Sequence, residues 1–211
     1  MNNKIIRLET IKKIFNDKAP KLLGTHSKFS VLVPIVKVNN HLHLLFQIRA
    51  QKLKNRPGEI SFPGGALEQN ETFEDACIRE TREELNVKKE NINLFGELDY
   101  ILTPYDAFVK PFIGALENIN PDNLDFNKDE VDELFTIPLE FFEKNSPELH
   151  YVYLEPKTGD DFPFHKVPGG KKYPFKKGKY PVYFYNHDDY NIWGITARIV
   201  NNFIETYKKF L

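Results

Sequence analysis

Three glutamates within residues 62–87 have a spacing that suits a metal site. Glu80, Glu83 and Glu84 occupy positions i, i+3 and i+4, which places their carboxylates on one face of a helix. Like charges at this spacing destabilise a helix by roughly 0.2–0.5 kcal/mol per pair, so a compensating cation is expected. Mg²⁺ or Mn²⁺ fits, because these hard cations prefer carboxylate and carbonyl oxygens.

A glycine turn and an arginine flank these glutamates. Pro63-Gly64-Gly65 predicts a tight turn that brings backbone carbonyls or amides close to the helix. Arg79 can hold the Glu71 carboxylate in a bidentate pair, because a guanidinium presents two parallel N–H donors. The alternative is a solvated acidic face on which Arg79 and Arg82 are ordinary ion-pair partners.

The complete spacing resembles the signature of the Nudix hydrolase family. Every charged position of the signature and its first glycine are matched here. The order is Gly65, five residues, Glu71, seven residues, Arg79-Glu80 and then Glu83-Glu84. Two positions depart from the signature, since Thr81 replaces an aliphatic residue and Asn86 replaces the closing glycine. Asn86 can still end the helix in the left-handed conformation, and Thr81 keeps a methyl group for packing.

This resemblance implies a Nudix-type α/β/α sandwich with a mixed β-sheet, and an enzyme that hydrolyses a nucleoside diphosphate linked to another group. It implies these metal ligands: Glu80, Glu83, Glu84 and the backbone carbonyl of Gly64 or Gly65. Glu71 and Arg79 would support the geometry of the loop and the helix. The metal would neutralise and orient the anionic diphosphate and activate a water molecule. Glu83 is the preferred general base, and Glu130 and Glu133 are alternatives.

A second pattern lies immediately upstream. Three-residue spacers separate its parts, which are Arg49-Ala50, Lys54, Gly58 and Phe62-Pro63-Gly64-Gly65. This pattern resembles the additional motif of the coenzyme A pyrophosphatase branch of the family, and so does the segment 192–200. Lys54 stands where the motif has arginine, which keeps the charge but loses the planar fork. The preceding Leu45-Phe46-Gln47-Ile48 also departs from the usual Leu-Leu-Thr.

Coenzyme A carries a 3′-phosphate in addition to its diphosphate, so its binding site needs extra cations. We expect Arg49, Lys54, Arg56 and Phe62 to contribute to substrate binding, with Lys52 as a further cation. The predicted reaction is metal-dependent hydrolysis of coenzyme A or its derivatives to 3′,5′-ADP and 4′-phosphopantetheine. One alternative is another Nudix substrate, such as ADP-ribose, NADH, a damaged nucleotide or an RNA cap. The other is a Nudix-fold protein that binds a nucleotide or RNA without catalysis, although such a protein would be free to lose the glutamates.

Apolar periodicity predicts the elements that position these residues. Strands are expected at 29–38, 42–50, 93–102, 107–116 and in the segment that ends at Pro138, and helices at 6–16, 72–85, 139–144 and 192–211. Residues 52–63 are expected to form a loop. Residues 150–185 are expected to form short strands and turns, as a substrate-side flap or a dimer contact. Their aromatic residues should be buried: Tyr151, Tyr153, Phe162, Phe164, Tyr173 and Phe175.

Length and composition favour one domain over residues 1–211, with a helical extension at 1–28 and an aromatic, basic insertion at 150–185. The formal net charge of −1 gives no general reason to expect a nucleic acid or a membrane as partner, so a small-molecule substrate is expected. Cys77 is the only cysteine, which excludes an intramolecular disulfide and a cysteine-based zinc site. The N-terminus lacks the features of a secretory signal, so a cytoplasmic location is expected.

Overall fold

Alternating apolar residues give the two first strands of the chain two apolar faces. Successive side chains of a strand point to opposite sides, so Leu32 and Val36 face one side of the sheet and Val33 faces the other. The next strand repeats this alternation, with Leu45 on the first side and Leu44 on the second. A sheet of this kind must be covered on both faces.

The computed structural model describes residues 8–20, 22–24 and 26–210. The main sheet contains β1 (Ser27–Val38), β2 (His41–Arg49), β3 (Ile60–Ser61), β4 (Gly64–Ala66), β5 (Ile92–Glu97), β6 (Ile101–Leu102), β7 (Ala107–Leu116) and β8 (Val131–Pro138). Its central order is β3-β2-β1-β7-β5, while β4, β6 and β8 pair with β1, β7 and β2. The β1–β7 pair is parallel and the other pairs are antiparallel, so the sheet is mixed, as predicted.

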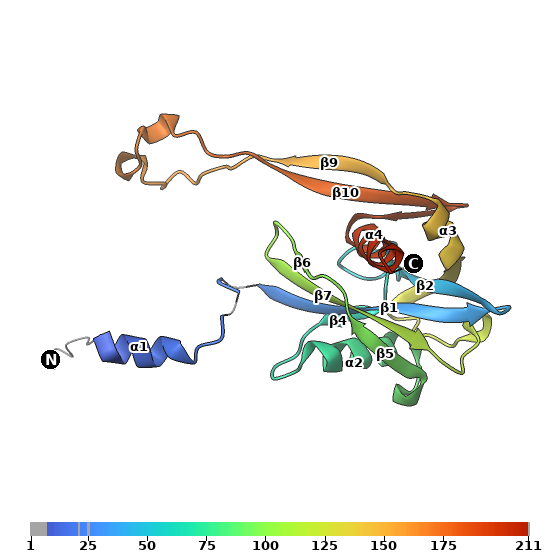
Figure 1. Cartoon of the computed structure of the whole chain (residues 1–211). Coiled ribbons are helices and arrows are strands. Elements are labelled where there is room, and N and C mark those ends of the chain that lie inside the picture. Colours follow the sequence, from blue (N-terminus) through green and yellow to red (C-terminus); the bar gives the residue numbers. More distant parts are fainter. Residues whose placement is uncertain (1–7, 21, 25, 211) are drawn as a thin grey trace.

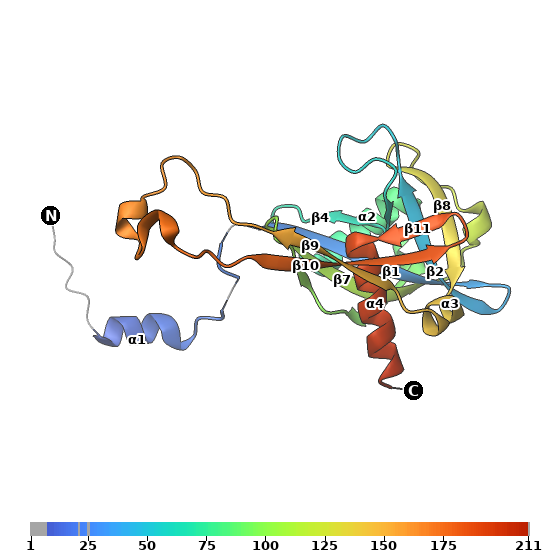
Figure 2. The same ribbon diagram turned by 90° about the horizontal axis from the view of Figure 1, so that it is seen from above.

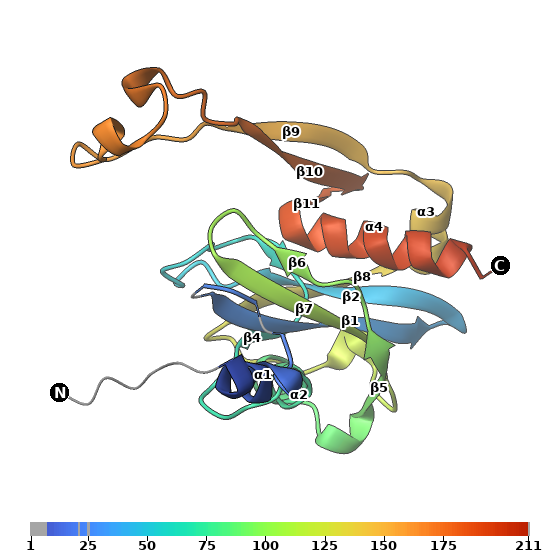
Figure 3. The ribbon, with the colours of Figure 1, turned by 60° about the vertical axis from the view of Figure 1, so that its left-hand side comes forward.

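Helices cover both faces of this sheet (Figure 1). The covering helices are α2 (Phe73–Leu85) on one face, and α3 (Leu139–Lys144) and α4 (Gly194–Lys208) on the other. A smaller sheet in the order β11-β10-β9 lies over α4 (Figure 3), with the bounds β9 (Glu148–Leu154), β10 (Gly178–His187) and β11 (Tyr190–Trp193). The predicted α/β/α fold class is confirmed, and the small sheet adds a further layer.

The core between the main sheet and α4 is built around aromatic rings. Phe46 is fully buried, and its ring centroid lies 4.8 Å from that of Phe62 and 5.5 Å from that of Phe135. Phe142, from α3, lies 6.0 Å away on another side of the same ring. Phe62, predicted to contribute to substrate binding, is therefore a core residue with 3% of its surface exposed. By stacking on Phe46, Phe62 holds the start of the glycine turn against the core.

The structure corrects three predicted elements. The loop expected at 52–63 contains strand β3, whose Ile60 and Ser61 pair with Ile48 and Gln47 of β2. The strand expected at 93–102 is divided into β5 and β6 by residues 98–100, which belong to neither strand, and within β5 the pairing with β7 is irregular between Leu94 and Gly96. The last helix begins at Gly194 and not at Ile192, because Ile192 pairs with Tyr185 as part of β11. Gly194 has a φ of 65°, a left-handed conformation that separates the strand from the helix.

The burial predicted for the aromatic residues of 150–185 is wrong for three tyrosines. Tyr151, Tyr153 and Tyr173 are 41%, 76% and 42% exposed. The reason is that β9 and β10 form a ribbon that runs beyond the main body (Figure 2), so α4 covers only part of the small sheet. Phe162 and Phe164 are partly buried because they pack against each other at the far end of the ribbon, with ring centroids 4.8 Å apart.

The N-terminal helix α1 (Leu8–Asn16) confirms the described part of the helix predicted at 6–16. All of its side chains are exposed. The predicted extension 1–28 includes residues 1–7, 21 and 25, which lie outside the described residues, as does Leu211 at the end of the predicted last helix. Among the described helices, none has both the length and the apolar character needed to cross a membrane.

Replacing Phe46 tests this account of the core. Phe46→Ala removes a fully buried ring that three other rings contact, so we expect the free energy of unfolding to fall by about 3–5 kcal/mol. For a chain of this length the melting temperature should fall by roughly 6–20 °C in a thermal unfolding experiment. The matched control is Phe15→Ala in α1, where the ring is 60% exposed and a shift below about 2 °C is expected. Equal shifts in melting temperature for the two variants would contradict the assignment of Phe46 to the centre of the core.

Candidate metal centre

Helix α2 carries most of the candidate site, and its ends are defined by side-chain and backbone caps. The Thr72 hydroxyl accepts a hydrogen bond from the Asp75 N–H at 3.1 Å, which starts the helix as predicted. Asn86 ends it in the left-handed conformation, with φ 50° and ψ 30°, so it performs the role expected of a glycine. Thr81 is fully buried and donates to the Cys77 carbonyl at 2.7 Å. Both departures from the family signature therefore preserve the helix.

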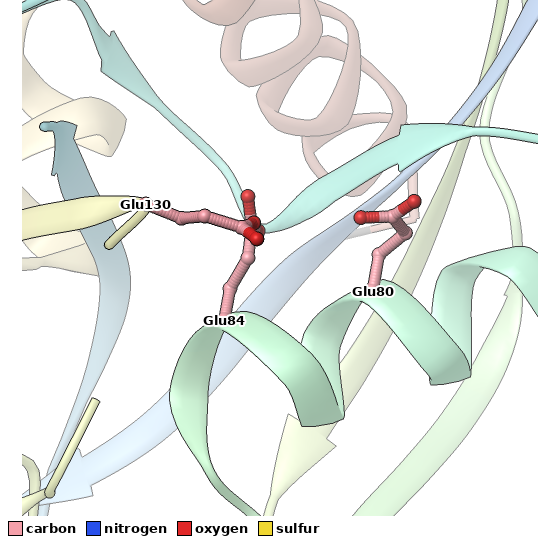
Figure 4. A group of neighbouring side chains, drawn as sticks. All are labelled: Glu80, Glu84 and Glu130. Atoms are coloured by element: carbon pink, nitrogen blue, oxygen red, sulfur yellow. The ribbon is translucent and has the colours of Figure 1, made fainter. Parts of the chain in front are cut away.

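Three carboxylates converge beside this helix (Figure 4). Glu80, Glu84 and Glu130 each offer an oxygen atom that lies within 4.8 Å of the others. Glu84 is 2% exposed, and Glu80 is partly buried. The structure thus brings together two of the three predicted helix ligands and adds Glu130, which the sequence suggested only as an alternative base.

Backbone hydrogen bonds bring Glu130 to the helix. The Asn127 N–H donates to the Glu84 carbonyl at 2.9 Å, which ties the loop before β8 to the end of α2. The Ala50 N–H donates to the Glu130 carbonyl at 2.9 Å, which ties the same loop to the end of β2. No local sequence pattern encodes either contact, which is why this third carboxylate could not be placed from the spacing alone.

The Glu83 side chain lies away from this group. Successive residues of a helix are about 100° apart, so Glu80 and Glu84 differ by about 40° while Glu83 and Glu84 differ by about 100°. Glu83 is accordingly 54% exposed and accepts a hydrogen bond from Arg79 at 3.0 Å. The three glutamates therefore do not share one face as predicted. Glu80 and Glu84 face the cluster, and Glu83 faces outward. The roles of Glu83 as metal ligand and base stay predictions.

Arg79 connects the separate parts of the site. Its guanidinium donates to both carboxylate oxygens of Glu71, at 2.8 and 3.0 Å, as the predicted bidentate pair requires. It also donates to Glu80 at 2.8 Å and to the Ala66 carbonyl at 3.0 Å. The hydrogen bonds from Arg79 hold the pKa of Glu71 below its usual value, so this carboxylate stays charged.

The tight turn predicted at Pro63-Gly64-Gly65 is only a bend at Pro63, because Gly64 and Gly65 pair with β1 as part of β4. This segment, called the glycine turn, lies against two of the carboxylates. The Gly64 N–H donates to a Glu84 carboxylate oxygen at 2.9 Å. A Cβ atom added to Gly65 would lie 2.3 Å from the carboxyl carbon of Glu80, closer than two such atoms can approach. Glycine is therefore required for this contact. A ligand role for the Gly65 carbonyl stays a prediction.

The electrostatics of the cluster favour a cation. Burial raises the pKa of Glu84 to about 8, an effect that the Gly64 N–H opposes and the charges of Glu80 and Glu130 increase. Burial also raises the pKa of Glu80, although Arg79 acts in the opposite direction. Such a group must either take up protons or bind a cation. Because the donors are all carboxylate oxygens, they fit the preference of Mg²⁺ or Mn²⁺.

Gln47 is a polar neighbour that the sequence analysis did not assign. It is fully buried in β2 and lies beside Glu84, where its amide favours the charged carboxylate. Both amide atoms nevertheless lack a well-aligned hydrogen-bond partner among the described residues. A glutamine between Phe46 and Ile48 in a buried strand was the only sequence signal for this residue.

The predicted substrate-binding cations lie at the end of β2, which is Arg49, and in the loop between β2 and β3, which carries Lys54 and Arg56. Arg49 is half-buried, and no described residue accepts a hydrogen bond from its buried Nε. Lys54 and Arg56 are exposed, whereas Lys52 forms an ion pair with Asp129, next to Glu130. The loop and the carboxylates are thus neighbours in the fold. Their roles in substrate binding stay predictions.

Glu133, the other alternative base, lies outside the cluster. It accepts a hydrogen bond from the Tyr190 hydroxyl at 2.5 Å, and this contact raises the pKa of Tyr190 to about 12. The Tyr190 ring stacks on that of Phe135, with 3.6 Å between the ring centroids. Glu133 therefore links the main sheet to β11.

Comparison with known proteins agrees with this geometry. A family model described as the NUDIX domain matches residues 28–168. The mouse protein named peroxisomal coenzyme A diphosphatase NUDT7 is 36% identical over 141 residues, which cover 66% of this chain and 58% of that protein. The human protein named mitochondrial coenzyme A diphosphatase NUDT8 is 29% identical over 181 residues, or 85% of this chain and 69% of that protein. A MutT/nudix family protein from Enterococcus faecalis has a similar fold, with a TM-score of 0.50 and 16% identity over 97% of this chain and 69% of that one.

The burial of Glu84 predicts a pH-dependent stability. Because its pKa is raised from 4.5 to about 8 on folding, the folded protein binds this proton more tightly than the unfolded chain. This contribution is complete below about pH 4.5 and is lost as the pH rises through about 8. In the presence of a chelator, wild type should lose roughly 5–10 °C more in melting temperature than Glu84→Gln between about pH 5 and pH 8.5. Addition of Mg²⁺ should raise the melting temperature of wild type more at the higher pH than at the lower pH.

The control for this experiment is Glu83→Gln, in which the exposed carboxylate is removed and the buried one is kept. It should retain the pH dependence of wild type. If Glu84→Gln and wild type lost the same stability over this range, the buried carboxylate would not be the titrating group.

The contact between Gly65 and Glu80 predicts the effect of a single methyl group. Gly65→Ala must displace the Glu80 carboxylate, so Mn²⁺ affinity measured by titration calorimetry should fall roughly 10–100-fold. Gly96→Ala is the matched control, because an added Cβ meets no atom within 4 Å at that position. An unchanged affinity in Gly65→Ala would show that Glu80 does not bind the ion.

Proposed function

Because the chain belongs to the NUDIX domain family, we propose that it is a metal-dependent diphosphatase whose substrate is coenzyme A. The reaction consumes one water molecule and yields 3′,5′-ADP and 4′-phosphopantetheine. The observation that carries the hydrolytic part is the convergence of Glu80, Glu84 and Glu130 next to the Gly64-Gly65 turn. A divalent cation bound there supplies positive charge that neutralises the diphosphate and favours attack by water.

The protein's own residues position the reacting groups. Gly64 orients the Glu84 carboxylate, and Arg79 holds Glu80 against the turn while it anchors Glu71. The Glu80 and Glu84 carboxylates are thereby held in place before the substrate arrives, which lowers the cost of reorganisation during the reaction. Removing Arg79 would release several of these contacts together.

Glu83 is the proposed general base. Its carboxylate is more than half exposed, and it is held only at one oxygen by Arg79. It can therefore accept a proton from water at the edge of the site while the buried carboxylates bind the ion. The water oxygen joins one phosphorus, the bond from that phosphorus to the bridging oxygen breaks, and the second phosphate leaves with the bridging oxygen.

The position of the basic loop supports coenzyme A as the substrate. The Ala50 N–H donates to the backbone carbonyl of Glu130, so Arg49 at the end of β2 and the following loop with Lys54 and Arg56 begin next to a residue of the carboxylate cluster. Asp129 already neutralises Lys52, which leaves the other three cations for a further phosphate. We assign them to the 3′-phosphate of coenzyme A, with Phe62 supporting the loop from the core. The two mammalian relatives named as coenzyme A diphosphatases support this choice.

A cytoplasmic location stays a prediction, because these two relatives are named peroxisomal and mitochondrial. Substrate choice is tested directly by incubating the protein with coenzyme A, ADP-ribose, NADH and 8-oxo-dGTP in Mg²⁺ or Mn²⁺, with products identified by mass spectrometry. Faster release of 3′,5′-ADP from coenzyme A than turnover of any competitor is the expected result. Turnover of another diphosphate alone would reject coenzyme A and keep the hydrolase. Binding without turnover would favour a non-catalytic module.

Arg49 provides a sharper test of the substrate. Arg49→Ala removes a partly buried guanidinium next to the cluster, so kcat/KM for coenzyme A should fall about 10–100-fold, the loss expected for one charged hydrogen bond. The value for ADP-ribose, which has no 3′-phosphate, should change by less than about 3-fold. Arg82→Ala is the control, since Arg82 is an exposed arginine on α2. Equal losses on both substrates would reject the 3′-phosphate assignment.

A further inference from the structure

Strand β9 has an open outer edge. It is the last strand in the order β11-β10-β9, and in the described part of the chain no strand pairs with its other side. Each residue from Glu148 to Tyr153 is exposed. The strand therefore presents a row of backbone N–H and C=O groups that another strand can pair with.

This edge lacks the features that usually protect an exposed strand. Edge strands are commonly shortened, bulged, or interrupted by lysine or proline. The segment Glu148–Leu154 contains neither lysine nor proline, and it pairs with β10 in regular register over its whole length. Its exposed residues are largely apolar, including Leu149 at 44% and Val152 at 47%. Tyr151 and Tyr153 are exposed on the same face of the strand as Leu149, and Val152 lies on the opposite face.

The ribbon formed by β9 and β10 also projects beyond the main body (Figures 2 and 3). A two-stranded ribbon is marginally stable in water by itself, whereas additional strands with an apolar face stabilise it. Among the described elements, α4 packs mainly on β10 and β11 of the small sheet. A further strand paired with β9 would therefore stabilise the projecting part.

Charge is distributed unequally along this ribbon. The loop between β9 and β10, together with the start of β10, has more lysines than acidic residues: Lys157, Lys166, Lys171, Lys172, Lys176, Lys177 and Lys179 against Glu155, Asp160 and Asp161. Of these, Lys177 pairs with Glu155. The opposite end, near α3 and the turn between β10 and β11, is acidic: Glu140, Glu143, Glu148, Asp188 and Asp189 against Lys144, which pairs with Glu140. The ribbon is thus basic at its tip and acidic at its base. Two such ribbons complement each other when they lie antiparallel.

We propose that a second copy of this chain covers the edge, with β9 pairing antiparallel to its counterpart about a two-fold axis at Tyr151. Centring the pair on this residue aligns the whole of Glu148–Leu154 with itself. It places Leu149 opposite Tyr153 of the second copy, so apolar side chains meet on the shared face. It also directs each basic tip toward the acidic base of the other copy. Such a contact is self-complementary and stops at a dimer, because it occupies the open β9 edge of each copy.

The oligomeric state tests this inference independently of any catalytic activity. Sedimentation equilibrium of the full chain at about 1–100 µM should give twice the chain mass, with dissociation increasing as salt is added. Tyr151→Lys places two ammonium groups opposite each other on the axis and should weaken the dimer at least roughly 10-fold. Tyr105→Lys is the matched control, because Tyr105 is 74% exposed on a turn of the main body.

Introduced cysteines test the register. Cys77 is fully buried, so a new surface cysteine is the only one expected to react. Tyr151→Cys should form a disulfide-linked dimer under mild oxidation, because opposite residues on the axis bring their Cβ atoms within reach. Leu149→Cys should not cross-link alone but should cross-link when mixed with Tyr153→Cys.

Several results would overturn the proposal. They are a monomeric wild type over the whole concentration range, assembly beyond a dimer, and a dimer that Tyr151→Lys leaves intact. A monomer that binds a single-stranded RNA oligonucleotide, with the binding lost when Lys171 and Lys172 are changed to glutamate, would also overturn it and assign the basic tip to nucleic acid.

Discussion

The carboxylate of Glu84 is buried where three parts of the chain meet, and burying a charge is costly unless the protein compensates for it. The Gly64 N–H provides one compensating hydrogen bond, and the Gln47 amide lies close by. Glu80 and Glu130 do the opposite, because they add negative charge. The fold therefore concentrates charge where water is excluded, and this arrangement is favourable when a cation occupies it. The geometry of the glycine turn and of the loop before β8 follows from this requirement.

Arg79 connects the glutamates inside the cluster with those outside it. By holding Glu71 and Glu83 on the outer side of α2, the guanidinium balances two negative charges that would otherwise add to those inside. Its further contacts to Glu80 and to the Ala66 carbonyl fix the helix against the turn. One side chain thus joins Glu71, before the helix, to Glu80 and Glu83 on the helix.

The segment 62–65 couples this site to the core. Phe62 stacks on Phe46 within the aromatic core, and the following glycines contact Glu80 and Glu84. Because the core is closely packed, the turn cannot shift without disturbing it. The small outer sheet is attached to the same core through Tyr185 and Ile192, yet its outer strand extends beyond it. A rigid body thus holds the site, while the projecting ribbon provides surface for contacts with another chain.

The sequence by itself determined the features that depend on local spacing. The helix 72–85, its left-handed end at Asn86, the Arg79–Glu71 pair and the mixed sheet between helices followed from periodicity, turn chemistry and the family signature. Only the tertiary structure decided the features that depend on contacts between distant segments. It brought Glu130 into the cluster through the hydrogen bonds from Asn127 to Glu84 and from Ala50 to Glu130, which join residues 43 and 80 positions apart in the chain. It placed Phe62 in the core. It also left Tyr151 exposed, because an apolar pattern predicts burial but cannot specify whether α4 or a second chain covers the strand.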